Sequence, residues 1–263
     1  MDLGLRNRTA VVLAASRGMG FATARALARE GCHLAICARG KEDLEKAARE
    51  IEKETDTSVF RVALDITKRR AIGKFLRTVK RKFGSIDILV VNCGGPPPGT
   101  ALALSEKDYD DAVKSTLMVA IDWMRAVAPV MIRQKWGRIV TIQSTSIKSP
   151  IDGLTLSNTM RAGVAGFCKS LSREVAPHGV TVNVVCPGMI LTDRLKSLAE
   201  VRARKTGLSM EQQLWNMASE IPAGRIGSPD DFAPAVVFLA SEPARYITGT
   251  VIQVDGGLTK TLL

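Results

Sequence analysis

The sequence predicts an α/β fold in which one doubly wound parallel sheet of about seven strands carries helices on both faces. Three observations lead to this prediction. Short apolar runs rich in β-branched residues alternate with amphipathic helical stretches along the whole chain. Hydrophobic residues make up 46% of the 263 residues, which is enough for one large core. Neither a repeat nor a linker divides the sequence, so residues 1–263 are expected to form a single domain.

The expected elements follow one another in an alternating order. The expected strands are 9–15, 33–38, 58–63, 86–92, 138–144, 181–186 and 250–254. The expected helices are 20–30, 42–54, 68–82, 108–135, 156–176 and one that opens at Ser228-Pro229-Asp230-Asp231. A serine N-cap, a proline in the first turn and an acidic residue three positions after the cap are typical of a helix start. Because strand–helix–strand connections are right-handed, this order predicts a parallel sheet covered on both faces.

The chain is basic, with 37 Lys and Arg against 26 Asp and Glu and a formal net charge of +11. Its densest basic stretch is 68–82. A nucleic-acid groove is one interpretation. The other is a solvated helix face, because apolar residues interleave with the charges at helical spacing: Ile72, Phe75, Leu76, Val79 and Phe83. Since no RNA- or DNA-binding motif is present, we favour the helix face and predict no nucleic-acid partner.

The reactive residue types do not form a metal or disulfide pattern. The cysteines lack a CxxC pair and are Cys32, Cys37, Cys93, Cys168 and Cys186. The two histidines lie far apart in sequence. No metal site is therefore expected, and a reducing cytoplasm is the expected compartment. The start of the chain does not resemble a signal peptide, and no apolar run is expected to approach the roughly 18 residues of a membrane helix.

A glycine-containing loop follows the first expected strand and reads Ala14-Ala15-Ser16-Arg17-Gly18-Met19-Gly20. Glycines let the backbone approach a pyrophosphate, and the helix start that follows offers free N–H groups and the positive end of a dipole. A plain turn is the alternative. The position directly after a first strand favours a dinucleotide site that includes Ala14, Ser16, Arg17, Gly18, Met19 and Gly20. Ala14 occupies the place of the first glycine of the usual triplet.

The end of the second expected strand distinguishes two nicotinamide cofactors. An acidic residue there would hydrogen-bond both ribose hydroxyls and select NAD. This chain has Ala38-Arg39 instead, with Arg17 and Lys41 nearby. Arginine forms strong, directional bonds with phosphate, so the pattern predicts NADP(H) bound through its 2′-phosphate, with NAD as the alternative. The alternative, which we favour less, is that Arg39 is a solvated turn residue.

Several segments in order resemble the short-chain dehydrogenase/reductase family, particularly its 3-oxoacyl-(acyl-carrier-protein) reductase branch. The resemblance covers nearly the whole chain and includes residues 64–66, 89–95, 183–192, 221–227, 247–249 and 254–257. It implies a Rossmann fold and an NAD(P)-dependent oxidoreductase acting on a small carbonyl or alcohol. It also implies that the cofactor contacts Asp65, Ile66, Asn92, Cys93, Gly94, Pro187, Gly188, Ile190 and Thr192. The family motif is altered at Val91 and Cys93.

The resemblance implies a mechanism that uses a tyrosine, a lysine, a serine and an asparagine. Ser144 occupies the serine position. The tyrosine position holds Ser157, the lysine position Arg161 and the asparagine position Thr116. These four are the candidate catalytic residues, and Arg161 is also expected at the cofactor ribose. Three of the four differ from the family pattern, so an atypical active site is predicted.

The substitutions change the acid–base chemistry more than the geometry. Ser157 and Arg161 keep the i, i+4 spacing that places both on one helix face. A serine hydroxyl is a much weaker acid than a phenol, and arginine does not release its proton near neutrality. General acid–base catalysis contributes roughly 10² to 10⁴ in rate. Another donor is therefore required, either Lys148, which could instead be a surface lysine, or a water held by Thr116, Ser144 and Ser157.

Three functions remain open on these grounds. The chain is an oxidoreductase with a different proton donor, a catalytically silent dinucleotide-binding sensor or scaffold, or a basic RNA-binding protein. The well-kept cofactor segments favour the first two, and Ser144 with Pro187-Gly188 favours the oxidoreductase. A stiff turn at Pro96-Pro97-Pro98, beside the expected nicotinamide position, agrees with an altered site but equally with a purely structural role.

Residues 189–220 form a polar, mobile-looking stretch where the family carries its substrate lid. Basic residues there (Arg194, Lys196, Arg202, Arg204, Lys205) precede apolar ones (Leu208, Met210, Leu214, Trp215, Met217). We therefore expect an acyl or other hydrophobic substrate with an anionic group. By family analogy the long helices 108–135 and 156–176 would pack in a dimer interface, which predicts a homodimer or homotetramer.

Overall fold

The protein, described by a computed structural model over residues 1–262 except for the side chain of Lys205, contains the predicted parallel sheet. Seven strands lie in the order β3-β2-β1-β4-β5-β6-β7. They are β1 (Thr9–Leu13), β2 (His33–Ala38), β3 (Val59–Ala63), β4 (Ile88–Val91), β5 (Gly137–Ile142), β6 (Val180–Pro187) and β7 (Val251–Val254). All six neighbouring pairs are parallel. The strand order reverses between β1 and β4, where doubly wound sheets open a ligand crevice.

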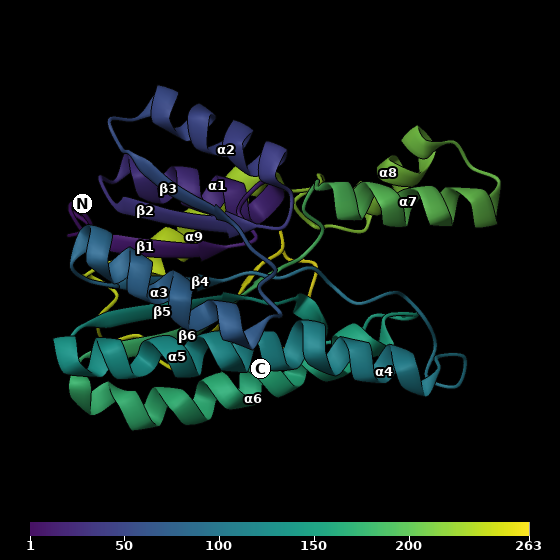
Figure 1. Ribbon diagram of the computed structural model, residues 1–263. Helices are drawn as coiled ribbons and strands as arrows, with labels where there is room; N and C mark the ends of the chain where they lie inside the picture. Colours follow the sequence, from purple (N-terminus) through teal and green to yellow (C-terminus); the bar gives the residue numbers. More distant parts are fainter. Residues whose placement is uncertain (263) are drawn as a thin grey trace.

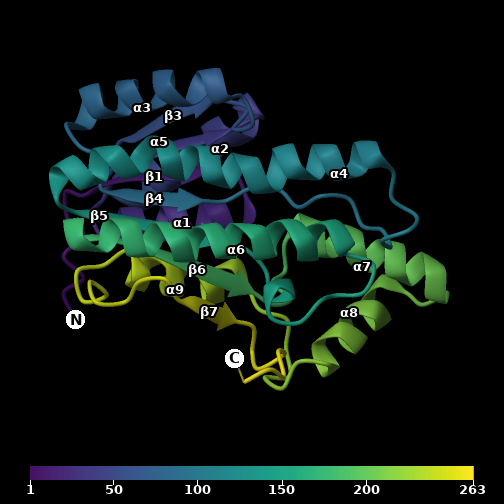
Figure 2. The same ribbon diagram turned by 90° about the horizontal axis from the view of Figure 1, so that it is seen from below.

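Helices cover both faces of this sheet (Figures 1 and 2). One face carries α1 (Gly18–Arg29), α2 (Lys41–Glu54) and α9 (Pro229–Leu239), and the other carries α3 (Arg69–Phe83), α5 (Val119–Gln134) and α6 (Thr155–Val175). In Figure 1, α7 (Asp193–Thr206) and α8 (Met210–Ser219) stand out beyond the body of the sheet. Short 3₁₀ turns, η2 (Thr145–Ile147) and η3 (Ala176–His178), flank α6. The fold therefore has three layers with the sheet in the middle.

The two hydrophobic cores lie on opposite faces of the sheet. Along β1, Ala10 and Val12 belong to one core, whereas Val11 and Leu13 belong to the other. Successive strand residues point to opposite faces, and a parallel sheet buries both. This is why the strands read as continuous apolar runs rather than as alternating ones.

The basic stretch forms α3, and its charges lie on the outer surface. Ile72, Phe75, Leu76 and Val79 are buried against the sheet, as the helical spacing predicts. The interpretation of this stretch as a solvated amphipathic helix is confirmed. Its apolar face has no surface left for another partner because that face lies in the core.

The long helix predicted over 108–135 is interrupted. It begins as α4 (Glu106–Ala112), continues as a π-helical segment η1 (Val113–Met118) and resumes as α5. Ser105 starts it with a capping box that pairs with Asp108. A π-segment contains an extra residue per turn and often occurs at functional sites. Here it contains Thr116.

The expectation that no stretch approaches a membrane span is wrong for this helical run. Residues Glu106–Gln134 contain an 18-residue window of mean hydropathy 1.4, of which 44% is buried. The buried apolar residues include Trp123, Met124 and Val127, which pack in the core with the sheet. Packing in the core therefore accounts for the apolar composition of this run, and by itself such a window is weak evidence for a span.

Most of the segment 189–220 forms the helices α7 and α8, for which the sequence analysis predicted no secondary structure. Thr192 Oγ1 accepts a hydrogen bond from the Leu195 amide at the start of α7. Ser209 and Gln212 form a capping box at the start of α8. The pattern Ser-x-x-Gln is a recognised helix start, so the second of these helices could have been found from the sequence.

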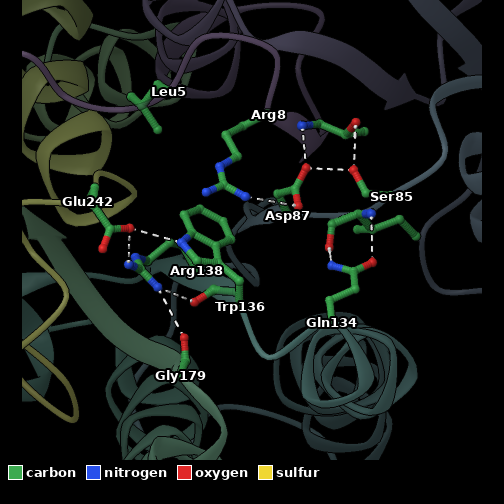
Figure 3. Close-up of polar contacts among 12 residues, drawn as sticks. Leu5, Arg8, Ser85, Asp87, Gln134, Trp136, Arg138, Gly179 and Glu242 are labelled. Carbon is green, nitrogen blue, oxygen red and sulfur yellow. Dashed lines mark hydrogen bonds and ion pairs between the residues drawn. The ribbon is translucent and has the colours of Figure 1, made fainter.

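The amino ends of the central strands are connected by a buried arginine (Figure 3). Arg138 Nε donates to the Ser241 carbonyl at 3.1 Å, and Nη1 donates to the carbonyls of Gly137 at 2.9 Å and Gly179 at 3.2 Å. Its Nη2 reaches Glu242 Oε2 at 3.1 Å. These bonds connect the starts of β5 and β6 to the segment after α9.

The network continues from Glu242 through Trp136 and Arg8 to Asp87 (Figure 3). Trp136 Nε1 also donates to Glu242 Oε2 at 2.9 Å, and the Arg8 guanidinium lies 3.8 Å from the centroid of the Trp136 ring. Arg8 in turn pairs with Asp87, whose carboxylate accepts the Thr9 amide at 2.8 Å. The network lies at the end of the sheet opposite the cavity described next.

Candidate active site

A cavity of about 480 Å³ opens at the carboxyl ends of β5 and β6. Eight residues predicted for the cofactor or the chemistry line it, namely Met19, Ser144, Ser157, Arg161, Pro187, Gly188, Ile190 and Thr192. They come from the start of α1, the segment after β5, helix α6, the last residue of β6 and the segment after β6. The carboxyl edge of a parallel sheet is where such folds bind ligands.

The loop between β1 and α1 has the backbone of a phosphate-binding turn. Gly18 has φ +59° and Ala14 has φ +49°. Glycine adopts such left-handed conformations without strain, whereas alanine does so at a cost of about 1–2 kcal/mol. Among the described residues no side chain caps α1, and the first turn of this helix contains no acidic residue. The first N–H groups of α1 are therefore free to bind an anion.

The third position of the glycine motif, Gly20, cannot hold a residue with a Cβ atom for steric reasons. A Cβ added at Gly20 would lie 2.5 Å from the Ala14 carbonyl oxygen and 2.6 Å from Asn92 Nδ2. Asn92 Nδ2 donates to the same carbonyl at 3.2 Å. The loops after β1 and β4 are thus held together, with α1 packed closely against them.

Ser157 and Arg161 form a hydrogen-bonded pair on one face of α6. Both are buried, at 5% and 6% exposure, and both line the cavity. Arg161 Nε donates to Ser157 Oγ at 3.1 Å, and Nη1 donates to the Gln143 carbonyl at 3.2 Å. Within residues 1–262 its Nη2 makes no hydrogen bond. Because Ser157 Oγ accepts from a permanent cation, its own hydrogen remains available to a ligand.

Two further hydroxyls lie near this pair in the fold. Ser144 caps η2, and its Oγ accepts the Ser146 amide at 3.1 Å while the residue also lines the cavity. Thr116 is fully buried in η1, which packs against α6. Thr116 Oγ1 has no hydrogen-bond partner in the described part of the chain, so it can still bind a water. Thr116 does not line the cavity, unlike the other three catalytic candidates.

Cys93 is buried and does not line the cavity, and the positive charges of Arg161 and Arg194 act on its thiol. Burial raises the pKa of the Cys93 thiol, and the two guanidinium charges only partly oppose this. The thiol therefore stays protonated and is a poor nucleophile near neutrality. Cys93 thus behaves as a packing residue at a position where the family pattern differs.

The first turn of α7 connects to both sides of the crevice. Arg194 donates from Nη1 to the Gly95 carbonyl and from Nη2 to the Pro96 carbonyl, each at 3.0 Å. The preceding residue, Asp193, pairs with Arg17 at 3.1 Å. The start of the expected lid is therefore attached to the glycine loop and to the loop after β4.

The predicted residues for the adenosine half lie outside the cavity. Asp65 accepts from the Thr67 amide at 3.0 Å and from Thr67 Oγ1 at 2.7 Å, and these bonds lower the pKa of Asp65. The Ile66 carbonyl accepts the Trp123 indole N–H at 3.0 Å. Arg39 is exposed at the end of β2 and has no ion pair with any described residue. Arg17 pairs with Asp193 and, at 3.6 Å, with Asp43, so its positive charge already has protein partners.

The cavity also contains residues that the sequence analysis did not identify. They include Gln143, Thr145, Leu195, Leu198, Glu220, Leu258, Thr259 and Lys260, together with residues 149–151 and Leu154. Gln143 falls at the end of a predicted strand, and 258–260 follows the last strand, so neither position carries a motif. Lys148, the alternative proton donor, does not line the cavity. Of the predicted lid residues, Arg194, Arg202 and Met217 line it, whereas Trp215 is 70% exposed.

Comparisons with known proteins agree with this geometry. The family profile described as enoyl-(acyl carrier protein) reductase matches residues 13–259. The 3-oxoacyl-(acyl-carrier-protein) reductase FabG of Staphylococcus epidermidis is 34% identical over 254 residues, covering 96% of this chain and 99% of that protein. The Escherichia coli FabG is 33% identical over 256 residues, with 97% and 99% covered.

Solved structures show the same architecture. The L-sorbose reductase of Gluconobacter frateurii, complexed with NADPH and L-sorbose, is 31% identical with a TM-score of 0.94, and both chains are covered completely. A variant of the actinorhodin polyketide ketoreductase with NADPH is 30% identical with a TM-score of 0.92, with 97% and 98% covered. The predicted resemblance is thus confirmed over nearly the whole length. The chain belongs to the short-chain dehydrogenase/reductase family of NAD(P)-dependent oxidoreductases.

Proposed function

We propose that the chain is an NADP(H)-dependent reductase of a small carbonyl compound, in which Ser144, Ser157 and Arg161 stabilise the oxyanion of the reaction. The observation that carries this proposal is the Arg161 Nε to Ser157 Oγ hydrogen bond of 3.1 Å, inside a cavity that Ser144 also lines. Two hydroxyl donors and a guanidinium thus surround one space. Such an arrangement favours a substrate oxygen that becomes negatively charged.

The loops around the crevice fit a nicotinamide dinucleotide. The positive φ of Gly18, the tight packing at Gly20 and the uncapped start of α1 provide a cradle for the pyrophosphate. Asp65, Ile66, Asn92, Cys93 and Gly94 would hold the adenosine and central parts, and Pro187, Gly188, Ile190 and Thr192 the nicotinamide. When bound, the reduced nicotinamide supplies hydride.

Ser157 and Arg161 together stabilise the reacting oxygen, which is the role of the tyrosine and lysine that the family usually has at these positions. As the substrate carbonyl accepts hydride at carbon, its π electrons move to oxygen and form an alkoxide. Ser144 and Ser157 donate hydrogen bonds to that oxygen, and the positive charge of Arg161 strengthens the Ser157 donor through their shared hydrogen bond. Arg161 contributes its positive charge and its hydrogen bond to Ser157, and no proton transfer is assigned to it.

The proton that completes the alcohol comes from water in this proposal. Thr116 Oγ1 has free hydrogen-bonding capacity, and Ser144 and Ser157 expose hydroxyls to the cavity. A water between these groups would protonate the alkoxide and leave hydroxide, which exchanges with solvent. Lys148, which like Thr116 does not line the cavity, is the alternative proton donor.

Removing the Ser157 hydroxyl tests the proposal. In Ser157→Ala, kcat for NADPH-dependent carbonyl reduction is expected to fall by about tenfold to a hundredfold, because one charge-assisted donor to the oxyanion is lost. NADPH affinity, measured by fluorescence titration, should stay unchanged. The matched control is Ser170→Ala, which removes an exposed hydroxyl from the same helix. Equal kcat in the wild type and Ser157→Ala would contradict the assigned role of Ser157.

Arg39 determines the cofactor preference in this proposal. The wild type is expected to bind NADPH more tightly than NADH, and Arg39→Asp is expected to reverse or abolish that difference. The physical reason is that an exposed guanidinium without a protein carboxylate pairs with the 2′-phosphate, whereas an aspartate repels it and accepts the ribose hydroxyls. Fluorescence titration with both nucleotides measures the effect.

The control for the charge change is Arg70→Asp, an exposed substitution on α3. It should leave both nucleotide affinities as they are in the wild type. Equal affinity of the wild type for NADPH and NADH would refute the NADP assignment while leaving dinucleotide binding intact. A homodimer or homotetramer and a cytoplasmic location stay predictions.

A further inference from the structure

The cavity is positively charged, and its cations form no ion pair within residues 1–262. Four lining residues are cations, namely Arg161, Arg194, Arg202 and Lys260, whereas Glu220 is the one acidic residue among those that line it. Within residues 1–262, none of these five side chains belongs to an ion pair. Of these cations Arg161 is buried, whereas Arg194, Arg202 and Lys260 are exposed. A buried cation is costly unless an anion compensates it, and exposed cations beside it add to the positive potential. The cavity therefore favours an anionic ligand.

Arg161 and Arg194 are the cations closest to the proposed chemistry. Arg161 lies next to Ser157 and keeps Nη2 free of hydrogen bonds within the described chain. Arg194 is held in place by the carbonyls of Gly95 and Pro96. Removal from water and the positive charge of Arg161 both lower the pKa of Arg194, so the two guanidiniums repel each other. A ligand anion near both would relieve that repulsion.

The wall beside these cations is aliphatic. On α7, Arg194, Leu195, Leu198 and Arg202 follow the spacing i, i+1, i+4 and i+8, which places them on one helix face. Met217 of α8 also lines the cavity and is 2% exposed. A ligand that fills the cavity therefore meets apolar side chains directly beside the arginines.

We propose that this cavity binds an aliphatic oxo acid whose carboxylate is held by Arg194 close to Arg161. Its ketone lies at Ser144 and Ser157, and its chain packs on Leu195 and Leu198. A carboxylate matches the planar guanidinium, which can donate two parallel hydrogen bonds to it. The inference rests on the proposed reductase function and adds the substrate class, with the carboxylate next to the ketone or one carbon away.

Binding and turnover test the inference separately. Hexanoate, which cannot be reduced, is expected to bind the NADP⁺-loaded protein at least about tenfold more tightly than hexanamide in calorimetry, because only hexanoate carries the charge. Arg194→Met should weaken hexanoate binding by roughly tenfold to a hundredfold and leave hexanamide binding unchanged. Lys196→Met is the control, since Lys196 is an exposed cation on the same helix that does not line the cavity.

Turnover gives the second measurement. The wild type should reduce 2-oxohexanoate or 3-oxohexanoate with a higher kcat/KM than the corresponding methyl ester, and Arg194→Met should reduce that ratio by about tenfold or more. Equal binding of hexanoate and hexanamide would overturn the inference. A loss of NADPH affinity in Arg194→Met with unchanged hexanoate binding would overturn it too, because Arg194 would then serve the cofactor. Hexanoate binding without reduction of any oxo compound would instead overturn the reductase function and leave the anion site intact.

Discussion

The double variant Ser157→Tyr, Arg161→Lys is expected to reduce carbonyl compounds about 10² to 10⁴ times faster than the wild type, because it restores a general acid. A phenol is a far stronger acid than the Ser157 hydroxyl, and a lysine four residues later lowers the phenol pKa. Both positions lie on one face of α6 and line the cavity. The added ring can therefore extend into the cavity of about 480 Å³.

A matched variant distinguishes the effect of the tyrosine hydroxyl, the general acid, from the effect of the added aromatic ring. Ser157→Phe, Arg161→Lys introduces the same bulk and the same amine without the hydroxyl, so it should show no gain. The comparison is made as kcat/KM for NADPH oxidation over a panel of ketones. If the tyrosine variant is no faster than the phenylalanine variant on any ketone, the cleft does not support carbonyl reduction. That result would favour the alternative function, a dinucleotide-binding sensor or scaffold.

Arg138→Met is expected to lower the free energy of unfolding by about 3 kcal/mol, because it removes a buried cation from a fully bonded site. The Arg138 side chain is 2% exposed. Its loss leaves the carbonyls of Ser241 and Gly179 without their donor and removes the ion pair with Glu242. Trp136 also loses a guanidinium that lies 4.3 Å from its ring centroid.

Urea denaturation measures this effect. Arg133→Met, an exposed arginine of α5, is the control and should change the free energy of unfolding by no more than about 0.5 kcal/mol. The network lies at the amino ends of β5 and β6, whereas the cavity lies at their carboxyl ends. Cofactor affinity of folded Arg138→Met should therefore equal that of the wild type. An unfolding free energy within the range of the control would show that the buried arginine contributes little net stability.

Local patterns in the sequence predict most of the architecture. The alternation of apolar runs and amphipathic stretches predicts the seven parallel strands, and the spacing of Ile72, Phe75 and Val79 predicts the buried face of α3. The glycine loop after β1 is also recognisable, because its backbone requirement is local. These features succeed because one short segment contains all the residues that determine each of them.

Other features need more than the pattern of one segment. The predicted long helix overlooks the π-segment η1, because a single turn of i→i+5 hydrogen bonds has no characteristic residue type in the sequence. The helices α7 and α8 were not predicted because their many charges resemble a solvated loop, although the capping box at Ser209 was present. Ala14 has a positive φ, which an alanine in the sequence does not indicate. Packing around the crevice imposes this backbone conformation.

By itself, the sequence determined the fold class, the family and the residue types at the four catalytic positions. Each of these depends on identity and spacing along the chain. Only the tertiary structure decided that Arg161 donates a hydrogen bond to Ser157 and that Arg194 donates to a carbonyl of the loop after β4. It also decided that Lys260 lines the same cavity. The physical reason is that the cavity assembles from strand ends and loops far apart in sequence. Side-chain direction and charge balance there depend on packing, which residue spacing does not encode.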